Sequence, residues 1–290
     1  MLKGVDLSTF QKQVDYKKLK EEGIDFAILR CGYGKENSQK DAMFEEHYKG
    51  CKEAGIKVGA YLYSYCSNVE NAIKEAENCL YFIEGKQFDL PIFYDLEDRI
   101  TKVLGKNAIT EIALRFCRRI EQAGFKAGVY ANLDWFENYI DKYALIDEHF
   151  KIWLAQWYVE KPTATFPYQF WQFTNKLKVA GLSVDGNYCE NSEIIDNATK
   201  QIEAPEGSIE RLAIDVINGR YGNGEERKIN LGSKYYDVQA YVNEIMLKNK
   251  IEFIARNVIR GDYGNGQERK DILGNLFEKV QTRVNQILSK

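Results

Sequence analysis

The sequence IFYDLED at residues 92–98 is a short apolar run that ends in carboxylates. Alternate side chains of a strand point to the same face, so Asp95 and Glu97 are predicted to share one face, about 7 Å apart along the strand. Leu96 then faces the other way. Burying two carboxylates together costs on the order of several kcal/mol. Their proximity should raise one pKa and leave an acid protonated near neutral pH, which is typical of a catalytic site.

This run is the fourth of eight strand-like segments in the first 190 residues. The eight apolar runs cover residues 2–8, 26–32, 58–65, 90–97, 127–131, 151–157, 168–174 and 182–188. Amphipathic helical patterns fill several of the gaps, at residues 16–22, 42–54, 69–84 and 108–123. Gly23, Gly55 and Gly124 end three of these helices, and each is followed at once by the next strand.

The alternation of strand and helix predicts a parallel sheet with helices outside it, an α/β fold. Eight strands favour a closed TIM-like (β/α) barrel over an open sheet. The helices become short after the fifth strand, so we expect an irregular barrel. No glycine-rich phosphate loop follows the first strand, which argues against a dinucleotide-binding fold.

Acidic and aromatic residues recur where these strands end, and the active site of such barrels lies at the C-terminal ends of the strands. Asp6 ends the first strand and Asp185 lies in the eighth, and these two strands adjoin when the barrel closes. Four carboxylates would then converge in one cleft. The side chains expected around them are Tyr61, Tyr63, Tyr65, Tyr130, Trp153 and Gln172. A general acid, a stabiliser of positive charge and flat stacking surfaces are what a glycosidase needs.

Two other interpretations of this cluster stay open. Acidic residues at strand ends often only cap loops, and carboxylate clusters also bind Mg²⁺ or Ca²⁺. The tyrosines and Trp153 also fit a hydrophobic core. Because the chain has no phosphate loop and only two histidines, His47 and His149, we expect neither a cofactor nor a metal. Both histidines are predicted on the surface, where they could not serve a Ser-His-Asp triad or an HExxH zinc site.

The charge and cysteine content narrow the class of protein further. The 290 residues include 40 basic and 43 acidic side chains, for a net charge of −3. Residues 205–290 carry +2 and the first 204 carry −5, so neither part suggests nucleic-acid binding. The six cysteines all precede residue 190 and form no CxxC pair. We interpret them as free, buried thiols made in a reducing compartment.

The N-terminal sequence MLKGVDLSTF has no positive region followed by an apolar run of 7–15 residues, so we expect no secretory signal. No run of about 18 apolar residues occurs, so we expect no membrane insertion.

A tandem repeat occupies the C-terminal part of the chain. Residues 209–248 and 251–290 align without gaps at an offset of 42, with 21 identities in 40 positions. The match centres on GRYGNGEERK at 219–228 and GDYGNGQERK at 261–270. Apolar spacing predicts three short helices in each copy. The polar stretch NSEIIDNATKQIEAPEGS at 191–208 is the best linker candidate. The predicted domains are a catalytic barrel at 1–191, a linker at 192–208, and repeats at 209–248 and 249–290.

Several motifs, taken in order, resemble glycoside hydrolase family 25, the lysozymes (N-acetylmuramidases) of phage endolysins and bacterial autolysins. They are GVDLS, AYLYSY, YDLED, VYAN, WLAQW and WQF followed by VDGNY, and they span residues 1–190. The resemblance implies an irregular (β/α) barrel that cleaves the β-1,4 bond between N-acetylmuramic acid and N-acetylglucosamine.

The same resemblance implies a role for each of the site residues. Glu97 matches the general acid, and Asp95 matches the partner that orients the acetamido group of the substrate, with retention of configuration. Asp6 and Asp185 match supporting carboxylates. The residues that match contacts to the sugar are Tyr61, Tyr63 and Tyr130, and we place Trp153 and Gln172 with them.

The tandem units resemble the CW-seven repeat, a three-helix cell-wall-binding unit found at the C-termini of some phage lysins. The candidate wall-binding residues are Tyr221, Asn223 and Arg227 in the first copy and Tyr263, Asn265 and Arg269 in the second. Arg227 and Arg269 are suited to stem-peptide carboxylates. Tyr221 and Tyr263 fit either stacking on sugar or the core of the bundle. Two weak binding units would raise the local concentration of the barrel on a repeating polymer.

The sequence therefore predicts a peptidoglycan-cleaving endolysin that is targeted by its repeats. We expect it to be made in the host cytoplasm without a signal peptide and to act on the wall after release by lysis or a holin. Two alternatives remain at this stage. One is another N-acetylhexosaminidase, chitinase-like, and the other is a wall-binding protein with an inactive barrel.

Overall fold

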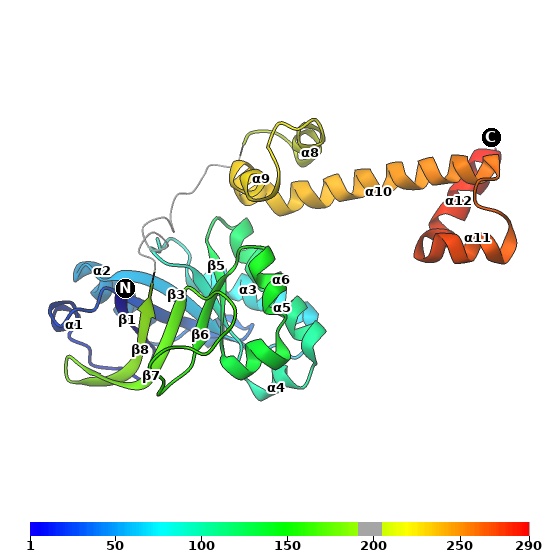
Figure 1. The fold of residues 1–290 in the computed structure, drawn as a ribbon. Coiled ribbons are helices and arrows are strands. Elements are labelled where there is room, and N and C mark those ends of the chain that lie inside the picture. The colour runs from blue at the N-terminus through cyan, green and yellow to red at the C-terminus, as the bar shows by residue number, and fades with distance from the viewer. Residues whose placement is uncertain (191–204, 290) are drawn as a thin grey trace. The chain divides into compact units, whose positions relative to one another are not determined.

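The computed structural model describes residues 1–190 and 205–289 of the chain. Its packing divides the chain into two compact units, Met1–Ile202 and Glu203–Lys290 (Figure 1). The first contains the strands and the second is helical. Most of the linker predicted at 192–208 lies outside the described residues.

The first unit is a closed barrel in which each strand pairs with the next and β8 pairs with β1. Its eight strands are β1 Leu2–Leu7, β2 Phe26–Tyr33, β3 Lys57–Tyr63, β4 Ile92–Asp95, β5 Ala127–Asn132, β6 Lys151–Ala155, β7 Phe170–Val179 and β8 Leu182–Cys189. The α/β barrel predicted from the sequence is therefore confirmed, including its eight strands. Its first seven strands run parallel.

Helices follow the early strands as the sequence indicates. They are α1 Tyr16–Glu21, α2 Phe44–Glu53, α3 Val69–Phe82, α4 Arg99–Lys102, α5 Lys106–Gln122 and α6 Lys142–Asp147, with short turns of helix at Asn37–Gln39 and Trp135–Tyr139. Gly23, Gly55 and Gly124 have φ values of 87°, 68° and 89°, and each stands between a helix end and the next strand. This left-handed conformation favours glycine, so the helix ends are confirmed. After β5 come only the helical turn at Trp135–Tyr139 and the short α6, and no helix lies between β6 and β7.

The expectation of a wholly parallel sheet is wrong at β8. This strand pairs antiparallel with both β7 and β1. Only Ala180 and Gly181 separate β7 from β8, and both have positive φ. Two residues can close a hairpin, whereas a parallel crossover needs a dozen or more. The seventh strand is also longer than predicted, because it continues to Val179 along its hairpin partner.

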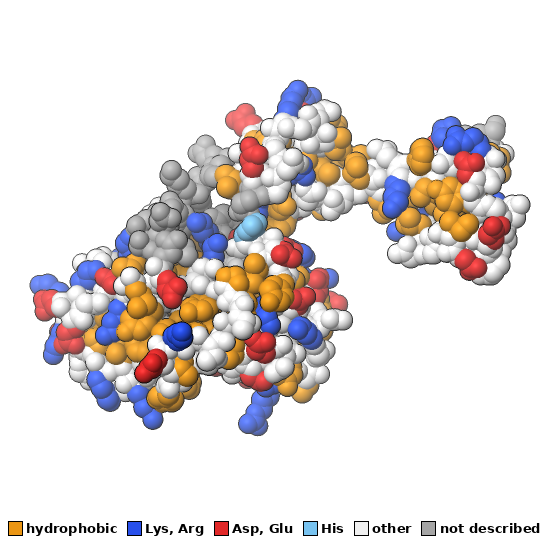
Figure 2. Space-filling view, in the orientation of Figure 1, with side chains coloured by type: hydrophobic (Ala, Val, Ile, Leu, Met, Phe, Trp, Pro, Cys, Tyr) orange, Lys and Arg blue, Asp and Glu red, His pale blue; other side chains and the backbone are white. Residues whose placement is uncertain are grey.

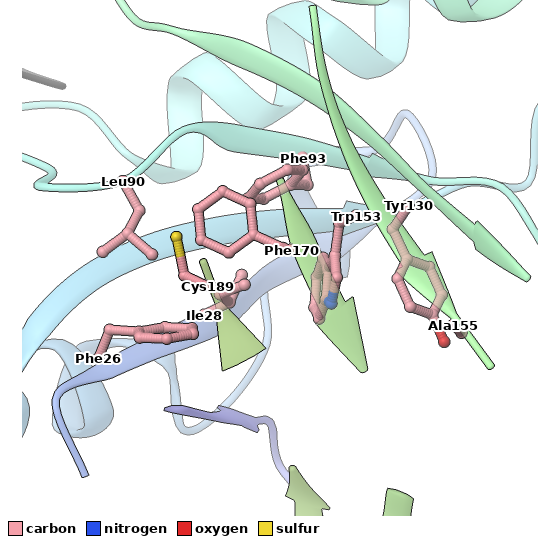
Figure 3. Close-up of a cluster of buried hydrophobic side chains, with 9 residues drawn as sticks. All are labelled: Phe26, Ile28, Leu90, Phe93, Tyr130, Trp153, Ala155, Phe170 and Cys189. Atoms are coloured by element: carbon pink, nitrogen blue, oxygen red, sulfur yellow. The ribbon is translucent and has the colours of Figure 1, made fainter. Parts of the chain in front are cut away.

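Large aromatic side chains fill the barrel interior (Figure 3). Phe93 of β4 lies at its centre, with ring centroids 5.2 Å from Trp153 and 5.3 Å from Phe170. All three side chains are buried. Rings from β4, β6 and β7 therefore meet across the barrel, and this packing supports the ends of the strands that carry the site.

His47 corrects a sequence-based expectation, because it is fully buried rather than on the surface. It lies on the inner face of α2 with Phe44 and Cys51, at the spacing of one helical stripe. Its Nε2–H donates to the carbonyl of Ser8 at 3.0 Å, so Nδ1 accepts from the Tyr16 hydroxyl at 2.8 Å. Burial lowers the pKa of His47, consistent with a neutral ring. His149 is exposed, and all six cysteines are buried thiols outside any disulfide, as predicted.

The second unit contains the two repeats. Its helices are α8 Ile209–Ile217, α9 Gly224–Leu231, α10 Tyr235–Arg260, α11 Gly266–Leu273 and α12 Phe277–Leu288, with helical turns at Gly232–Lys234 and Gly274–Leu276. The sequence predicts separate helices at the end of one repeat and the start of the next. The structure instead joins them in the 26-residue helix α10, because no glycine or proline interrupts this stretch.

Each repeat has its own small core. Leu212, Leu231 and Val238 belong to the first, and Ile254, Leu273 and Val280 belong to the second. Apolar side chains also lie exposed among charged ones on the visible face of the unit (Figure 2). None of the helices in the described part of the chain is both long and apolar enough to cross a membrane, α10 included.

Candidate active site

A cavity of about 280 Å³ opens at the end of the barrel where β1 to β6 finish. Nine of the ten barrel side chains that the sequence analysis places at the cleft line it, and the exception is Tyr65. The complete lining is Asp6, Ser8, Phe10, Gln11, Arg30, Tyr61, Tyr63, Asp95, Glu97, Tyr130, Trp153, Gln172 and Asp185. Side chains spread over 180 residues of sequence thus meet in one cleft. Sequence reasoning missed Ser8, Phe10, Gln11 and Arg30.

Three of the four carboxylates, Asp6, Asp95 and Asp185, lie in strands, and Glu97 lies in a loop. Asp6 and Asp185 are directly opposed in the register of β1 and β8. Because β8 runs antiparallel, Asp185 reaches this end of the barrel from the middle of its strand, rather than from the C-terminal end as predicted. Asp95 is the last residue of β4, and Glu97 lies two residues beyond the strand.

Asp6 is buried and held by two amide side chains. Its Oδ2 accepts from Asn187 Nδ2 at 2.8 Å and from Gln172 Nε2 at 3.0 Å. Burial, followed by the nearby charge of Asp185, raises the pKa of Asp6 to about 7, and the two hydrogen bonds oppose this rise. Asn187 also accepts from Trp153 Nε1 at 2.8 Å. The sequence signal for Asn187 is its position two residues after Asp185, on the same face of β8.

Asp95 is the most strongly perturbed carboxyl of the cleft. Its side chain is 5% exposed, and its Oδ1 has no hydrogen-bond partner among the described residues. Burial raises the pKa of Asp95 well above its ordinary value, and Glu97 and Asp6 add to this effect. Arg30 acts in the opposite direction. Burial therefore favours the protonated form of Asp95, in which the carboxyl is a hydrogen-bond donor.

Glu97 stands at the mouth of the cleft and is more exposed than Asp6 and Asp95. Loss of solvent around its carboxyl raises the pKa of Glu97, and the charges of Asp185 and Asp98 raise it further. A glutamate that combines access to the cleft with a raised pKa is suited to donate a proton. The pairing of Asp95 and Glu97 predicted from IFYDLED is present, although Glu97 lies in a loop.

Gln172 braces the floor of the cleft. Its Oε1 accepts from the Tyr130 hydroxyl and from Trp157 Nε1, each at 2.9 Å. Its Nε2 donates to Asp6 and, at 3.3 Å, to Asp185. Gln172 is 2% exposed, and its four hydrogen bonds connect aromatic side chains to acidic ones. Trp153 is also buried beneath the cleft, where its ring packs 4.5 Å from that of Tyr130.

Arg30 is the one cationic side chain in the lining of the cleft. Its Nε donates to Asp41 Oδ2 at 2.7 Å, and its guanidinium lies 5.2 Å from the ring centre of Phe10. The same Asp41 oxygen accepts from the backbone of Thr9 at 3.0 Å, which fixes the loop after β1. A charged residue inside the apolar strand sequence FAILRCGY is the signal that could have identified Arg30.

The predicted wall-binding arginines contact their own repeats. Arg227 donates to the carbonyl of Gly222, to Asn223 Oδ1 and to Gln239 Oε1 at distances of 2.9 to 3.1 Å. Arg269 makes the equivalent contacts to Gly264, Asn265 and Gln281. Tyr221 and Tyr263 are partly buried against the repeat cores. The loop, the arginine and the last helix of each repeat are therefore tied together.

The first unit is thus a closed α/β barrel with carboxylates clustered at one end, an arrangement that fits a glycoside hydrolase. Residues 5–182 match the glycosyl hydrolases family 25. The chain belongs to this family. Residues 210–246 and 252–288 each match the CW_7 repeat. The family resemblance and the repeat resemblance drawn from the sequence are both confirmed.

Curated relatives carry lysozyme names. The chain is 24% identical over 212 residues to the autolytic lysozyme of Clostridium acetobutylicum, a match that covers 73% of this chain and 62% of the relative. It is 30% identical over 202 residues to a lysozyme of Streptococcus phage Cp-7, covering 65% of this chain and 55% of the relative. The matches thus span less than two thirds of these relatives.

Solved structures share the fold. The CTP1L endolysin is 24% identical with a TM-score of 0.60, and the match covers 86% of this chain and all of that one. The catalytic domain of endolysin ply40 from bacteriophage P40 of Listeria monocytogenes is 26% identical with a TM-score of 0.55, over 68% of this chain and 97% of that one.

The raised pKa of Asp6 predicts how the stability of the barrel depends on pH. The native state holds this proton up to about pH 7, whereas the unfolded chain releases it near the model-peptide value of 3.8. The free energy of unfolding should therefore fall as pH rises from about 4 to about 7. Asp6→Asn keeps an oxygen that can accept from Asn187 and Gln172, and it should make this fall shallower.

Urea unfolding at several pH values, followed by tryptophan fluorescence, measures this effect because all four tryptophans lie in the barrel. Asp147→Asn, at an exposed position on α6, is the matched control and should keep the wild-type slope. An Asp6→Asn protein whose stability changes with pH as steeply as that of the wild type would contradict the assignment.

Proposed function

We propose that this protein is an endolysin-type lysozyme that hydrolyses the β-1,4 bond between N-acetylmuramic acid and N-acetylglucosamine in bacterial peptidoglycan. The observation that carries the proposal is the convergence of four carboxylates in one cleft, with the raised pKa of Glu97 at its mouth. Membership of glycosyl hydrolases family 25 and the lysozyme names of the relatives support it.

In this proposal Glu97 is the general acid. It protonates the glycosidic oxygen as the bond to the anomeric carbon breaks, and positive charge develops on the sugar ring. The nearby charges of Asp185 and Asp98 favour the protonated form of Glu97 before the reaction. The same group, now ionised, can then accept a proton from the water that completes hydrolysis.

Asp95 is proposed to orient the acetamido group of the substrate. Its unpartnered Oδ1 and its raised pKa suit a contact with an amide. An oriented acetamido oxygen can attack the anomeric carbon, giving an oxazolinium-like intermediate and retention of configuration. Asp6 and Asp185 are proposed as supporting carboxylates. Tyr61, Tyr63 and Tyr130 are proposed to contact the sugar, with Trp153 and Gln172 supporting them from below.

The repeats are proposed to hold the enzyme on the wall. Two copies on one chain raise the local concentration of the barrel at a repeating polymer. The candidate contacts are Tyr221, Asn223, Arg227, Tyr263, Asn265 and Arg269. Because Arg227 and Arg269 also tie their own loops, a change at either site requires a check of folding by circular dichroism. We propose that the protein acts on the wall after release from the cell that makes it.

Glu97→Gln tests the acid role directly. Glutamine keeps the size of the side chain but has no carboxyl proton to give, so turnover of purified cell walls should fall at least about 10²-fold. Reducing-end release measures the rate and also distinguishes a muramidase from another hexosaminidase. Glu70→Gln, at an exposed position of α3, is the matched control. Near-normal turnover by a folded Glu97→Gln protein would remove Glu97 from this role.

Asp95→Asn tests the substrate-assisted route. The change should lower turnover strongly, because asparagine cannot supply the carboxyl group that orients and stabilises the acetamido oxygen. NMR of early wild-type product should show retained anomeric configuration. Inverted product would instead require a water activated on the opposite face, between carboxyls about 6.5–9.5 Å apart. That outcome would overturn the proposed role of Asp95.

Removal of the chain from Glu206 onward tests whether the barrel carries catalysis and the repeats carry wall binding. The barrel forms a compact unit by itself, so it should fold and should cut soluble muropeptide oligomers at close to the full-length rate. On intact walls it should be slower, because tethering is lost. In a sedimentation assay, residues 205–290 should pellet with insoluble peptidoglycan. A helical fragment that stays in the supernatant would contradict the wall-binding role.

A further inference from the structure

The catalytic cleft is small for an enzyme that cleaves a polymeric substrate. Its volume of about 280 Å³ lies at the lower limit for small-molecule sites. A glycan strand that passes through it must therefore continue over the neighbouring surface. The residues beside the cleft decide whether that surface can bind the strand.

A row of three tyrosines leads away from the cleft. Tyr63 lines the cleft at the end of β3 and is paired in register with Tyr33 at the end of β2. Tyr65 contacts both rings, with centroids 5.1 Å from Tyr63 and 6.1 Å from Tyr33. Tyr65 is 47% exposed, so its ring covers little core and leaves a large surface free. Exposed aromatic rings in series are suited to stacking on successive sugars.

A groove of about 500 Å³ begins at Lys35, two residues along the chain from Tyr33. It lies between the loop that follows β2 and helix α3. The loop contributes Lys35, Glu36 and Asn37, and α3 contributes Ile73, Lys74, Glu77, Asn78 and Tyr81. Ile73 and Tyr81 are 37% and 55% exposed, respectively. The groove thus combines apolar surface with charged side chains of both signs.

The groove is held rigidly to the edge of the cleft. The backbone of Gly34 donates to the carbonyl of Tyr63 at 2.9 Å. From α3, Asn78 Nδ2 donates to the carbonyls of Gly34 and Glu36 at 2.9 and 3.2 Å. The buried Asn78 Oδ1 has no partner among the described residues. Fixed loops lose little conformational freedom on binding, which favours affinity.

The two lysines of the groove are the side chains that can bind an anionic group. Glu77 is already paired with Arg119, at 2.6 Å. Neither Lys35 nor Lys74 forms a salt bridge within the described part of the chain. Stem peptides of peptidoglycan carry free carboxylates beside the glycan strand, so a strand lying on the tyrosine row would bring such groups to the lysines.

We propose that Tyr33, Tyr65 and the adjoining groove form a distal subsite for peptidoglycan, in which Tyr65 stacks on a sugar beyond the cleft and Lys35 and Lys74 bind stem-peptide carboxylates. The subsite rests on the proposed hydrolysis of peptidoglycan. It would favour long, peptide-bearing strands over short fragments, because only long strands reach both the catalytic cleft and the groove.

The test compares two soluble substrates with the full-length chain: long peptide-bearing glycan strands and a tetrasaccharide with its stem peptides. Tyr65→Ser and the double variant Lys35→Gln/Lys74→Gln should each raise KM for long strands about tenfold and leave kcat unchanged. Turnover of the tetrasaccharide should stay within about twofold. The Tyr65 backbone N–H, which donates to Glu75 Oε1 at 3.1 Å, is kept in the variant.

Matched controls are Tyr143→Ser, which is 55% exposed on α6, and Lys49→Gln on α2. Both should behave as wild type on both substrates. Long strands stripped of peptide by an amidase separate the two contacts. On these strands the lysine variant should match the wild type, whereas Tyr65→Ser should keep its raised KM.

Equal losses on the long and short substrates, or no loss on long strands, would overturn the subsite. A lysine variant that also binds stripped strands more weakly would overturn the assignment of stem-peptide carboxylates. If the wild type cleaves neither substrate, the proposed function itself fails, and this result differs from the failure of the subsite alone.

Discussion

The pairing of β1 with β8 at Asp6 and Asp185 is the constraint on which the site depends. It closes the barrel and also brings together two carboxylates that are 179 residues apart in the chain. Their proximity is unfavourable when both are charged. The amides of Asn187 and Gln172 offset part of this cost by donating to Asp6, while burial raises its pKa to about 7. The same strand pairing therefore closes the barrel and places Asp185 where its charge raises the pKa of Asp6.

The aromatic interior of the barrel supports the polar residues around Asp6. Phe93, Trp153 and Phe170 fill the centre of the barrel, and the Trp153 Nε1–H reaches Asn187 just above them. The polar layer thus rests on a rigid apolar one, with each buried amide satisfied from below and from the side. Such a layer fixes the position of Asp6, and fixed polar groups around a cleft are suited to catalysis.

The C-terminal repeats are stabilised differently from the barrel. Each copy of about 40 residues has only a small core, near the lower size limit for a stable fold. The continuous helix α10 links the two cores, so each copy shares one long element with the other. In both copies an arginine ties the Gly-Asn-Gly turn to the last helix. The strong sequence identity between the copies is thus explained in part by the same internal contacts.

The sequence alone determined the βα alternation, the glycine helix ends and the repeat, because these depend on local periodicity and backbone conformation. It also indicated nine of the thirteen residues that line the cleft, since strand ends of a barrel share one edge. Only the tertiary structure decided the antiparallel course of β8, the burial of His47 and the roles of Arg30 and Asn187. These depend on register and on partners distant in sequence, such as Asp41 for Arg30 and Asp6 for Asn187. No local pattern records such pairings, because they exist only once the barrel has closed.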